Sequence, residues 1–547
     1  MKNEKGAVPV ADSRRTFLKA SVAGAAGAVV FPELLSAQTA QRTTPGSFEL
    51  DEISLHDLRK GLDSGKYTAR ALAQKYLARI DAIDRHGPSL NSVIEVNPDA
   101  LAIADRCDQE RRADKVRGPL HGIPILIKDN IASADKMQTT AGSLALQGSK
   151  PPKDAFVVAR LREAGAVILG KTNCSEWANF RSTRSTSGWS GRGGQTRNPY
   201  VLDRNPSGSS SGSAVAVSAN LCALAVGTET DGSIVSPACS NGIVGIKPTV
   251  GLLSRSGIIP ISHTQDTAGP MTRTVADAAA LLSILAAVDP ADNATEAARA
   301  RIEQDYTRFL DPSGLRGARI GVVRKYAGYS IPLDLVFEEA ITAMKRAGAE
   351  IIDPADVPTI GKFDDAELEV MLYEFKAGLN AYFATLGSNS PVHTLKELID
   401  FNEKNREREL RYFGQEMLAL AEAKGPLTTP DYLKSLADCR RLSRQEGIDA
   451  VMDKHRLDAL VAPTGNAAWP TDLVNGDHFT GSSTSLAAVA GYPNINVPMG
   501  FIFGLPIGVS FFGRAWSEPV LIKVAYAYEQ STKMRKAPTY LPTLNLG

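Results

Sequence analysis

Three serines stand side by side in PSGSSSGSAVAV, residues 206–217, and their hydroxyl groups are candidate nucleophiles. A serine hydroxyl becomes reactive when a neighbouring base takes its proton. Residues 208–212 match GxSxG, the nucleophile turn of α/β hydrolases, in which Ser210 would react. That turn needs a buried strand directly before it, whereas the polar residues VLDRNPS precede this one. The sequence therefore disfavours Ser210 as a nucleophile.

A flexible linker is the plainest alternative for a segment so rich in serine and glycine. Linkers do not run directly into an apolar segment, and here AVAVSANLCALAV follows at residues 214–226. The small side chains of this continuation predict a helix that packs closely against a strand.

A second pattern, GAVILGKT at residues 165–172, matches the phosphate-loop motif GxxxxGK[ST]. In a true phosphate loop the glycine-rich residues follow a strand and open a helix, so that their backbone N–H groups face the phosphates. Here a helical pattern, AFVVARLREA, comes first, and the residues AVIL themselves read as a buried strand. Nucleotide binding is therefore disfavoured.

Two further segments carry polar groups next to apolar runs. GTETDGSIVSPA at residues 227–238 places Ser233 in a glycine-containing turn two dozen residues after Ser209. Upstream, Lys128 follows the apolar run IPILI at residues 123–127. Taken singly, a lysine at a strand end or a serine in a turn is usually structural, so the order of the three pieces carries the argument.

An apolar strand ending in Lys-Asp, a GSS turn and a GTxTxGSI turn, in this order, resemble the amidase signature family. The resemblance continues through NGIVGIKPTVGLLSR at residues 241–255 and AGYPNINVPMGFIFGLPIGVSFFG at residues 490–513. It implies an α/β fold, the amidase signature fold, with a large mixed β-sheet core covered by α-helices on both faces. It also implies amide hydrolysis without a metal or other cofactor.

The resemblance assigns a role to each of three residues. Ser233 is the expected nucleophile, Ser209 the bridging serine held by a cis peptide bond after Gly208, and Lys128 the base behind it. The backbone N–H groups of Thr230, Asp231, Gly232 and Ser233 are the expected oxyanion donors. Lys128 must be neutral to accept a proton, and burial at the end of an apolar strand lowers the pKa of a lysine.

Several departures from the common family pattern are similar to the peptide amidase branch. The chain has SGSSSGS at residues 207–213 where GGSSGGS is common, and GTETDGSIV at residues 227–235 where GTDTGGSIR is common. The second difference places Asp231 at a position that is more often glycine, which leaves the contact of its side chain with substrate open. The branch implies hydrolysis of the C-terminal amide of peptides, with release of ammonia through an acyl-enzyme.

Two alternatives remain at this point. One is an amidase of the same mechanism that acts on aryl acylamides or other linear carboxamides. The other is a non-catalytic periplasmic peptide-binding protein that keeps the fold. The tRNA-amidating members of the family work in the cytoplasm with partner subunits, and the N-terminal segment argues against that role.

Residues 1–37 have the features of a twin-arginine export signal. SRRTFLK at residues 13–19 is followed by an apolar stretch from Ala20 to Phe31 and by the small-residue site Leu35-Ser36-Ala37. The apolar stretch is too short to span a bilayer. We therefore expect export by the twin-arginine machinery, a periplasmic protein without a membrane anchor after processing, and a monomer.

The elements that would position these residues alternate along the chain. Thr68 is the expected N-cap of a helix in which Leu72, Tyr76, Ile80 and Ile83 form the apolar face. Buried strands are expected at residues 123–127, 166–169, 223–226 and 458–463. Alternating helices and buried strands predict one α/β catalytic domain over residues 48–547, with a more helical cover at about residues 333–453.

Composition excludes other classes of function. The 547 residues carry 61 basic and 60 acidic side chains, a net charge of +1, so nucleic acid is not an expected partner and small neutral ligands fit better. The family resemblance implies that the substrate is a small-molecule or peptide amide. The five cysteines form no CxxC pair and are expected to be buried thiols.

Overall fold

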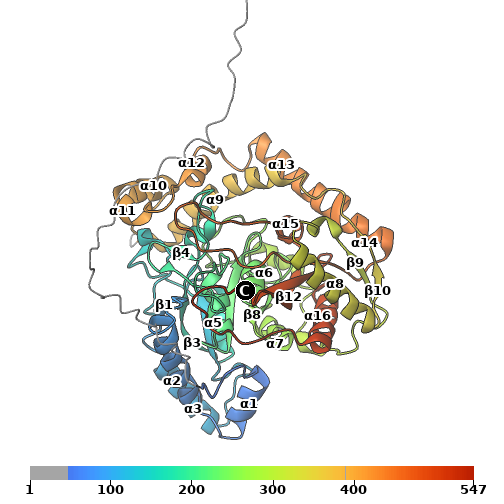
Figure 1. Ribbon diagram of the computed structural model, residues 1–547. Helices are drawn as coiled ribbons and strands as arrows, with labels where there is room; N and C mark the ends of the chain where they lie inside the picture. The colour runs from blue at the N-terminus through green and yellow to red at the C-terminus, as the bar shows by residue number, and fades with distance from the viewer. Residues whose placement is uncertain (1–46, 388–389, 547) are drawn as a thin grey trace, which may run out of the picture. The chain divides into compact units, whose positions relative to one another are not determined.

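The computed structural model describes residues 47–387 and 390–546, all within one compact unit (Figure 1). The expected export signal at residues 1–37 lies outside the described residues. Within the described part of the chain, none of the helices combines the length and the apolar character needed to cross a membrane. The five cysteines are buried and unpaired, which confirms that prediction.

A single mixed sheet of 11 strands runs through the molecule in the order β1-β3-β2-β6-β8-β7-β12-β13-β11-β9-β10. Its strands are β1 (Val93–Val96), β2 (Pro124–Lys128), β3 (Val167–Thr172), β6 (Leu224–Glu229), β7 (Val244–Lys247), β8 (Thr267–Thr272), β9 (Arg319–Val322), β10 (Glu350–Ile352), β11 (Ala459–Pro463), β12 (Asn494–Ile502) and β13 (Leu505–Phe512). A separate hairpin pairs β4 (Trp189–Ser190) with β5 (Gly194–Gln195).

The register of the strands brings the polar strand ends together. β2 pairs in parallel with β3 on one side and with β6 on the other. The carboxyl ends of β2 and β6 therefore meet at the same edge of the sheet, where Lys128 ends β2 and Thr228 and Glu229 end β6. The predicted strands are confirmed, with bounds shifted by one to three residues.

Helices cover both faces of the sheet, which confirms the expected fold class. The α-helices are α1 (Leu55–Asp63), α2 (Ala69–Arg79), α3 (Ala100–Arg112), α4 (Phe156–Glu163), α5 (Ser211–Ser218), α6 (Val235–Ser240), α7 (Val275–Leu285), α8 (Ile331–Arg346), α9 (Asp364–Leu386), α10 (Leu395–Lys404), α11 (Arg406–Glu409), α12 (Glu416–Glu422), α13 (Pro430–Arg440), α14 (Asp449–His455), α15 (Thr484–Ala490) and α16 (Glu518–Thr532). Short 3-10 or π-helical segments lie at η1 (Ile80–Arg85), η2 (Leu144–Leu146), η3 (Glu176–Asn179), η4 (Asn293–Ala298), η5 (Tyr306–Phe309), η6 (Arg324–Tyr326) and η8 (Arg441–Ile448).

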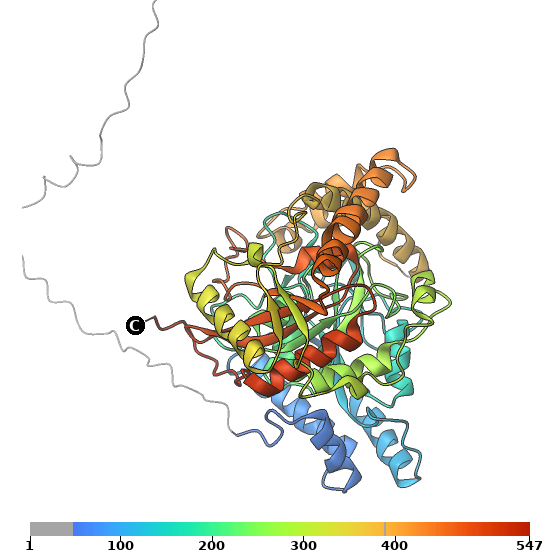
Figure 2. The ribbon, with the colours of Figure 1, turned by 90° about the vertical axis from the view of Figure 1, so that its right-hand side faces the viewer.

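Helices α5 and α6 approach the sheet closely because glycines face them. A side chain at Gly227 would collide with Ser210, the residue that precedes α5, and side chains at Gly245 or Gly269 would collide with Ile234, which precedes α6. The two turns that carry Ser209 and Ser233 lead directly into these helices, so their close packing fixes the turns on the sheet. On the other face α16 packs against α7 and α8, and Figure 2 shows α8 and α16 side by side.

The expected helix after Thr68 is present. Thr68 caps α2, since its hydroxyl accepts a hydrogen bond from the N–H of Ala71 at 3.0 Å. Residues 333–453 contain most of α8, the helices α9 to α13, most of α14 and the short strand β10, which joins the sheet edge.

Candidate active site

Lys128 is fully buried at the end of β2, and its ammonium group faces hydroxyl groups. Its Nζ lies 2.8 Å from Ser209 Oγ, 2.9 Å from Thr228 Oγ1 and 3.2 Å from the carbonyl oxygen of Thr228. Asn130 Nδ2 donates to the same Thr228 hydroxyl at 3.0 Å. Lys128 and Ser209 are thus in direct contact.

The environment of Lys128 favours its neutral form. Burial lowers its pKa to about 8, and the nearby acidic groups of Cys174, Asp266 and Glu229 offset this only in part. With a pKa of about 8, roughly one in ten Lys128 side chains is unprotonated at pH 7 and about half are at pH 8, so Lys128 can accept a proton.

The three serines of the opening segment have three different environments. Ser209 follows a cis peptide bond from Gly208, and its hydroxyl faces Lys128. Ser210 donates to the carbonyl oxygen of Thr228 at 2.9 Å, and Ser211 donates to that of Ser207 at 2.6 Å. Ser210 and Ser211 are fully buried and bonded to backbone, so they support the turn.

The second turn presents Ser233 at the start of α6. The carboxylate of Glu229 accepts hydrogen bonds from the N–H groups of Ile234 and Val235, at 2.7 and 3.0 Å, and so fixes the residues directly after Ser233. Ser233 is also tied to the first turn, because its carbonyl oxygen accepts from the N–H of Ser210 at 3.1 Å. Among the described residues, no acceptor is assigned to the N–H groups of residues 231–233.

The side chain of Asp231 links this turn to α15. Its two carboxylate oxygens accept hydrogen bonds from Thr484 Oγ1 and Ser485 Oγ, each at 2.6 Å. The neighbouring Thr230 donates to Asp266 at 2.6 Å, so side chains on both sides of the turn hold it in place. Burial raises the pKa of the Asp231 carboxyl group.

Ser233 opens onto a cavity of about 410 Å³, here called the nucleophile cavity. Ser209, Thr230, Asp231 and Ser233 form its floor. Its walls come from residues 178–187, from Met371 on α9 and from residues 469–485, and they combine polar groups with the aromatic rings of Phe180, Trp469 and Phe479. Helix α9 thus contributes one side chain, Met371, to the lining.

A second cavity of about 370 Å³, here called the Ser209 cavity, touches the same centre. It shares four lining residues with the nucleophile cavity, which are Ala178, Ser209, Thr230 and Ile261. Of these two cavities, Thr228, which contacts Lys128, and Asn130, which donates to Thr228, line only the Ser209 cavity, whereas Ser233 lines only the nucleophile cavity.

The phosphate-loop pattern at residues 165–172 is a strand. Gly170, Lys171 and Thr172 all lie within β3, which follows α4. Lys171 Nζ donates to the carbonyl oxygen of Ile131 and, at 2.8 Å, to Thr139 Oγ1. The segment has no free N–H cradle in front of a helix, which confirms that the match is false.

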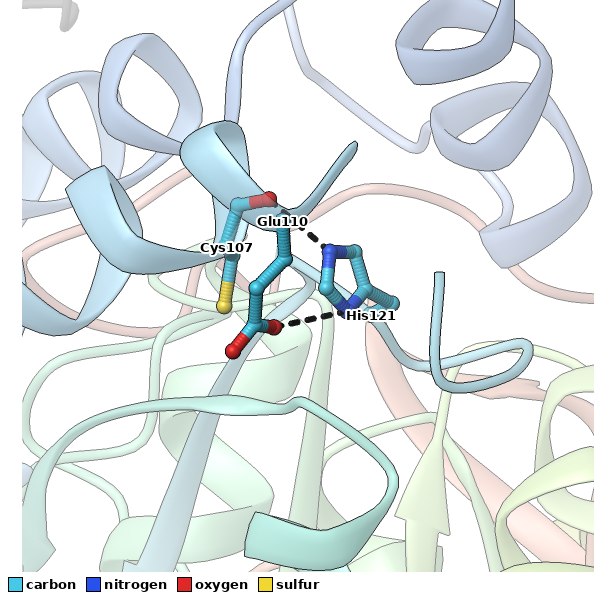
Figure 3. Close-up of side chains that lie close together, drawn as sticks. All are labelled: Cys107, Glu110 and His121. Carbon is cyan, nitrogen blue, oxygen red and sulfur yellow. Dashed lines mark hydrogen bonds and ion pairs between the residues drawn. The ribbon is translucent and has the colours of Figure 1, made fainter. Parts of the chain in front are cut away.

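Figure 3 shows Cys107, Glu110 and His121, whose potential metal-ligand atoms lie within 4.8 Å of one another. The group is already bonded within the protein. His121 Nε2 lies 2.9 Å from the carbonyl oxygen of Cys107, and the guanidinium of Arg117 binds both carboxylate oxygens of Glu110 at 2.8 Å. These contacts explain the cluster as a link between α3 and the loop before β2.

Comparison with known proteins adds to this geometry. The sequence profile of the Amidase family matches residues 71–522. The chain belongs to the amidase signature family. Its fold is similar to that of the native peptide amidase of Stenotrophomonas maltophilia, with 55% identity, a TM-score of 0.86 and coverage of 90% of this chain and all of the other.

Two further proteins that are similar to this chain are also amidases. A peptide amidase in complex with the competitive inhibitor chymostatin is 56% identical, with a TM-score of 0.87 over 90% of this chain and all of the other. A probable amidase of Arabidopsis thaliana is 44% identical over 504 residues, which cover 90% of this chain and 93% of the relative. The protein is an amidase, a hydrolase of amide bonds.

Three residues at the amidase centre were not singled out in the sequence. Thr228 and Asn130 contact Lys128 or its partner, and Glu229 caps the nucleophile turn. Asn130 and Thr228 stood beside the predicted residues in KDN and GTETDGS. Glu229 stands six residues before the start of α6, and an acid close to a helix N-terminus is a recognisable signal. Thr228 lies 98 residues after Asn130 and 100 residues after Lys128 in the sequence. Sequence spacing therefore could not show that these residues are in contact.

Proposed function

We propose that this amidase hydrolyses the C-terminal carboxamide of peptides through an acyl-enzyme on Ser233, with Ser209 and Lys128 as a proton relay. The contact of 2.8 Å between Lys128 Nζ and Ser209 Oγ, beside the cavity that holds Ser233, is the observation that carries the proposal. A carboxamide is a poor electrophile with a poor leaving group, and a relay of this kind supplies both a base and an acid.

Acylation begins with neutral Lys128. It takes the proton of Ser209, which takes the proton of Ser233 as Ser233 Oγ attacks the amide carbon. The negative charge that develops on the carbonyl oxygen is stabilised by the N–H groups of residues 230–233. As the tetrahedral intermediate collapses, the C–N bond breaks and the relay returns a proton through Ser209 to the leaving nitrogen, which departs as ammonia.

Deacylation uses the same relay, with water as the nucleophile and Ser233 Oγ as the leaving group. A water molecule loses a proton through Ser209 to Lys128 and attacks the ester carbon of the acyl-enzyme. The bond between that carbon and Ser233 Oγ breaks, Ser233 regains its proton, and the peptide acid leaves.

Two observations support a peptide as the acyl part of the substrate. The nucleophile cavity is large enough for more than one residue, and its walls pair aromatic rings with hydroxyl groups. The peptide amidases named above are 55% and 56% identical over nine tenths of this chain. The alternative amidase role, on aryl acylamides or simple carboxamides, would use the same centre.

A substrate panel separates these roles. We expect an N-acetyl dipeptide amide to be hydrolysed with a much higher kcat/KM than acetanilide or propionamide. Turnover of acetanilide alone would contradict the peptide proposal.

Covalent trapping separates an enzyme from a peptide-binding protein. Incubation with a serine-reactive phosphonate, followed by digestion and mass spectrometry, should place the adduct on Ser233 and leave Ser210 unmodified. An intact Ser233 after complete inactivation would contradict its role as nucleophile.

We also propose export to the periplasm by the twin-arginine pathway, on the sequence of residues 1–37. Replacing Arg14 and Arg15 by Lys should leave the protein in the cytoplasmic fraction of a bacterial host. An unchanged distribution would contradict the proposal.

A further inference from the structure

The Ser209 cavity is far larger than the leaving group of a primary amide requires. Ammonia occupies about the volume of a water molecule, roughly 30 Å³, whereas this cavity measures about 370 Å³. It ends at Ser209 and Thr228 and does not include Ser233. A cavity of this size beside the relay calls for an occupant larger than ammonia.

The chemistry of the relay decides which part of a substrate would enter it. The acyl carbon must lie over Ser233, in the nucleophile cavity, whereas the leaving nitrogen must face the group that gives it a proton. In the proposed mechanism that group is Ser209, which lines both cavities together with Thr230. The scissile bond therefore lies where the two cavities meet, with its nitrogen on the side of the Ser209 cavity.

The lining of the cavity selects for a neutral, apolar group. Ile258, Ile259, Pro260 and Ile261 form a continuous wall, and the first, second and fourth of these are buried. The apolar wall offers an aromatic or alkyl group a surface on which to be removed from water.

The charged side chains of the cavity have partners within the protein, and Glu229 is bonded through one carboxylate oxygen, which accepts from the N–H groups of Ile234 and Val235, while its Oε1 has no hydrogen-bond partner among the described residues. Arg255 Nε donates to Asp292 at 2.8 Å, and Asp266 accepts from the N–H groups of Ile261 and Ser262 at 2.9 and 3.0 Å. Neither charge is therefore directed at a ligand.

We propose that the Ser209 cavity is a leaving-group pocket, so that the enzyme also cleaves secondary amides of peptides whose amine is apolar, up to the size of aniline. This inference rests on the proposed function. In the step concerned, the C–N bond breaks and the proton on Ser209 passes to the amine nitrogen, which leaves as a neutral amine into the cavity.

The same geometry also permits the reverse reaction, in which an amine attacks the acyl-enzyme. An amine bound in the cavity attacks the ester carbon of the acyl-enzyme, the bond to Ser233 Oγ breaks, and the amine proton passes through Ser209 to Ser233. The product is the secondary amide of the peptide.

The first experiment compares kcat/KM for one N-acetyl dipeptide carried as primary amide, N-methylamide and anilide. We expect the wild-type enzyme to cleave all three. Two variants place a larger side chain in the cavity: Ile258→Phe in its wall and Ala291→Trp at an exposed lining residue. Each should lower the ratio of kcat/KM for the anilide to kcat/KM for the primary amide by about tenfold or more. Ala113→Trp, an exposed substitution on the C-terminal side of α3, is the matched control and should keep the wild-type ratio.

The outcomes separate the pocket from the function. Cleavage of the primary amide without cleavage of the anilide, or a ratio unchanged in both filled variants, would overturn the leaving-group pocket alone. Failure to cleave the primary amide would overturn the proposed function and the pocket with it.

A second measurement does not depend on folding of the filled variants. With aniline added during turnover of the primary amide, the wild-type enzyme should form the peptide anilide at a rate that saturates with aniline. A rate that stays linear with aniline, or no anilide product, would contradict a binding pocket for the amine.

Discussion

Lys128 on β2 and Lys171 on β3 are both fully buried, on neighbouring parallel strands, and burial lowers the pKa of each to about 8. The register separates them. Lys171 pairs with Ile127, and Lys128 pairs with Thr172, so the two lysine side chains project to opposite faces of the sheet. Lys128 meets Ser209 at the edge of two cavities, whereas Lys171 meets the carbonyl oxygen of Ile131 and the hydroxyl of Thr139.

The difference teaches that a lowered pKa does not by itself make a lysine a catalytic base. Both lysines have the electrostatic property that proton transfer requires, but Ser209, the partner of Lys128, lines both of the cavities described above, whereas Thr139, the partner of Lys171, lines neither of them. The shift of one residue in strand register decides which lysine has access to substrate. The same lysine that completes the phosphate-loop pattern in the sequence is the structural member of the pair.

Removal of the nucleophile that the Lys128 relay serves should have the largest effect on activity. Ser233→Ala should lower kcat by roughly 10⁴-fold or more, because the acyl-enzyme cannot form. Steady-state kinetics on the dipeptide amide measures the loss. Activity within tenfold of wild type would mean that another group attacks the amide.

Removing the base should have the next largest effect. Lys128→Ala should lower kcat/KM by roughly 10²- to 10⁴-fold, since general base catalysis typically contributes that much. The residual activity should shift to higher pH, where hydroxide replaces the lysine. A loss of less than threefold would contradict the relay.

Releasing the nucleophile turn from α15 should have a moderate effect. Asp231→Ala removes the acceptors of the Thr484 and Ser485 hydroxyl groups, and a small displacement of the N–H donors can cost up to about 100-fold in kcat. Asp231→Asn, which keeps one carboxamide oxygen as an acceptor, should restore part of the rate. Equal kinetics in both variants and in wild type would show that the link does not position the turn.

The smallest effect on activity is expected on the other face of the sheet. Lys171→Met should change kcat/KM by less than about threefold and lower the free energy of unfolding by about 1–3 kcal/mol, because it leaves two buried acceptors without a donor. Thermal unfolding and kinetics on the same preparation check both values. A loss of activity comparable to that of Lys128→Ala would remove the distinction between the two lysines.

The sequence predicted those features that depend on local pattern. The apolar run before Lys128 predicted a strand end, and the helical pattern before Gly165 predicted that the phosphate-loop match is false; the structure confirms both. Resemblance to a family supplied the order of Ser209 and Ser233, and the structure brings their turns together.

Contacts between distant segments could not be predicted. Asp231 and the hydroxyl groups that hold it are more than 250 residues apart, and the lining of the nucleophile cavity comes from residues 178–261, Met371 and residues 469–485. The aromatic wall at Trp469 and Phe479 lies in a loop whose sequence has no periodicity to indicate its neighbours. Only the folding of the sheet, with β11 to β13 entering after the helical cover, brings that loop to the site.

The pH dependence of kcat/KM in wild type and in Lys171→Met tests the central claim most directly, that neutral Lys128 is the base. Because burial lowers the pKa of Lys128 to about 8, its neutral fraction increases as the pH rises toward that value. We predict that kcat/KM rises about tenfold per pH unit below pH 8 and reaches a plateau above it, with the same midpoint in both proteins. A profile that is flat from pH 5 to 10, or a midpoint that disappears in Lys171→Met, would contradict the account.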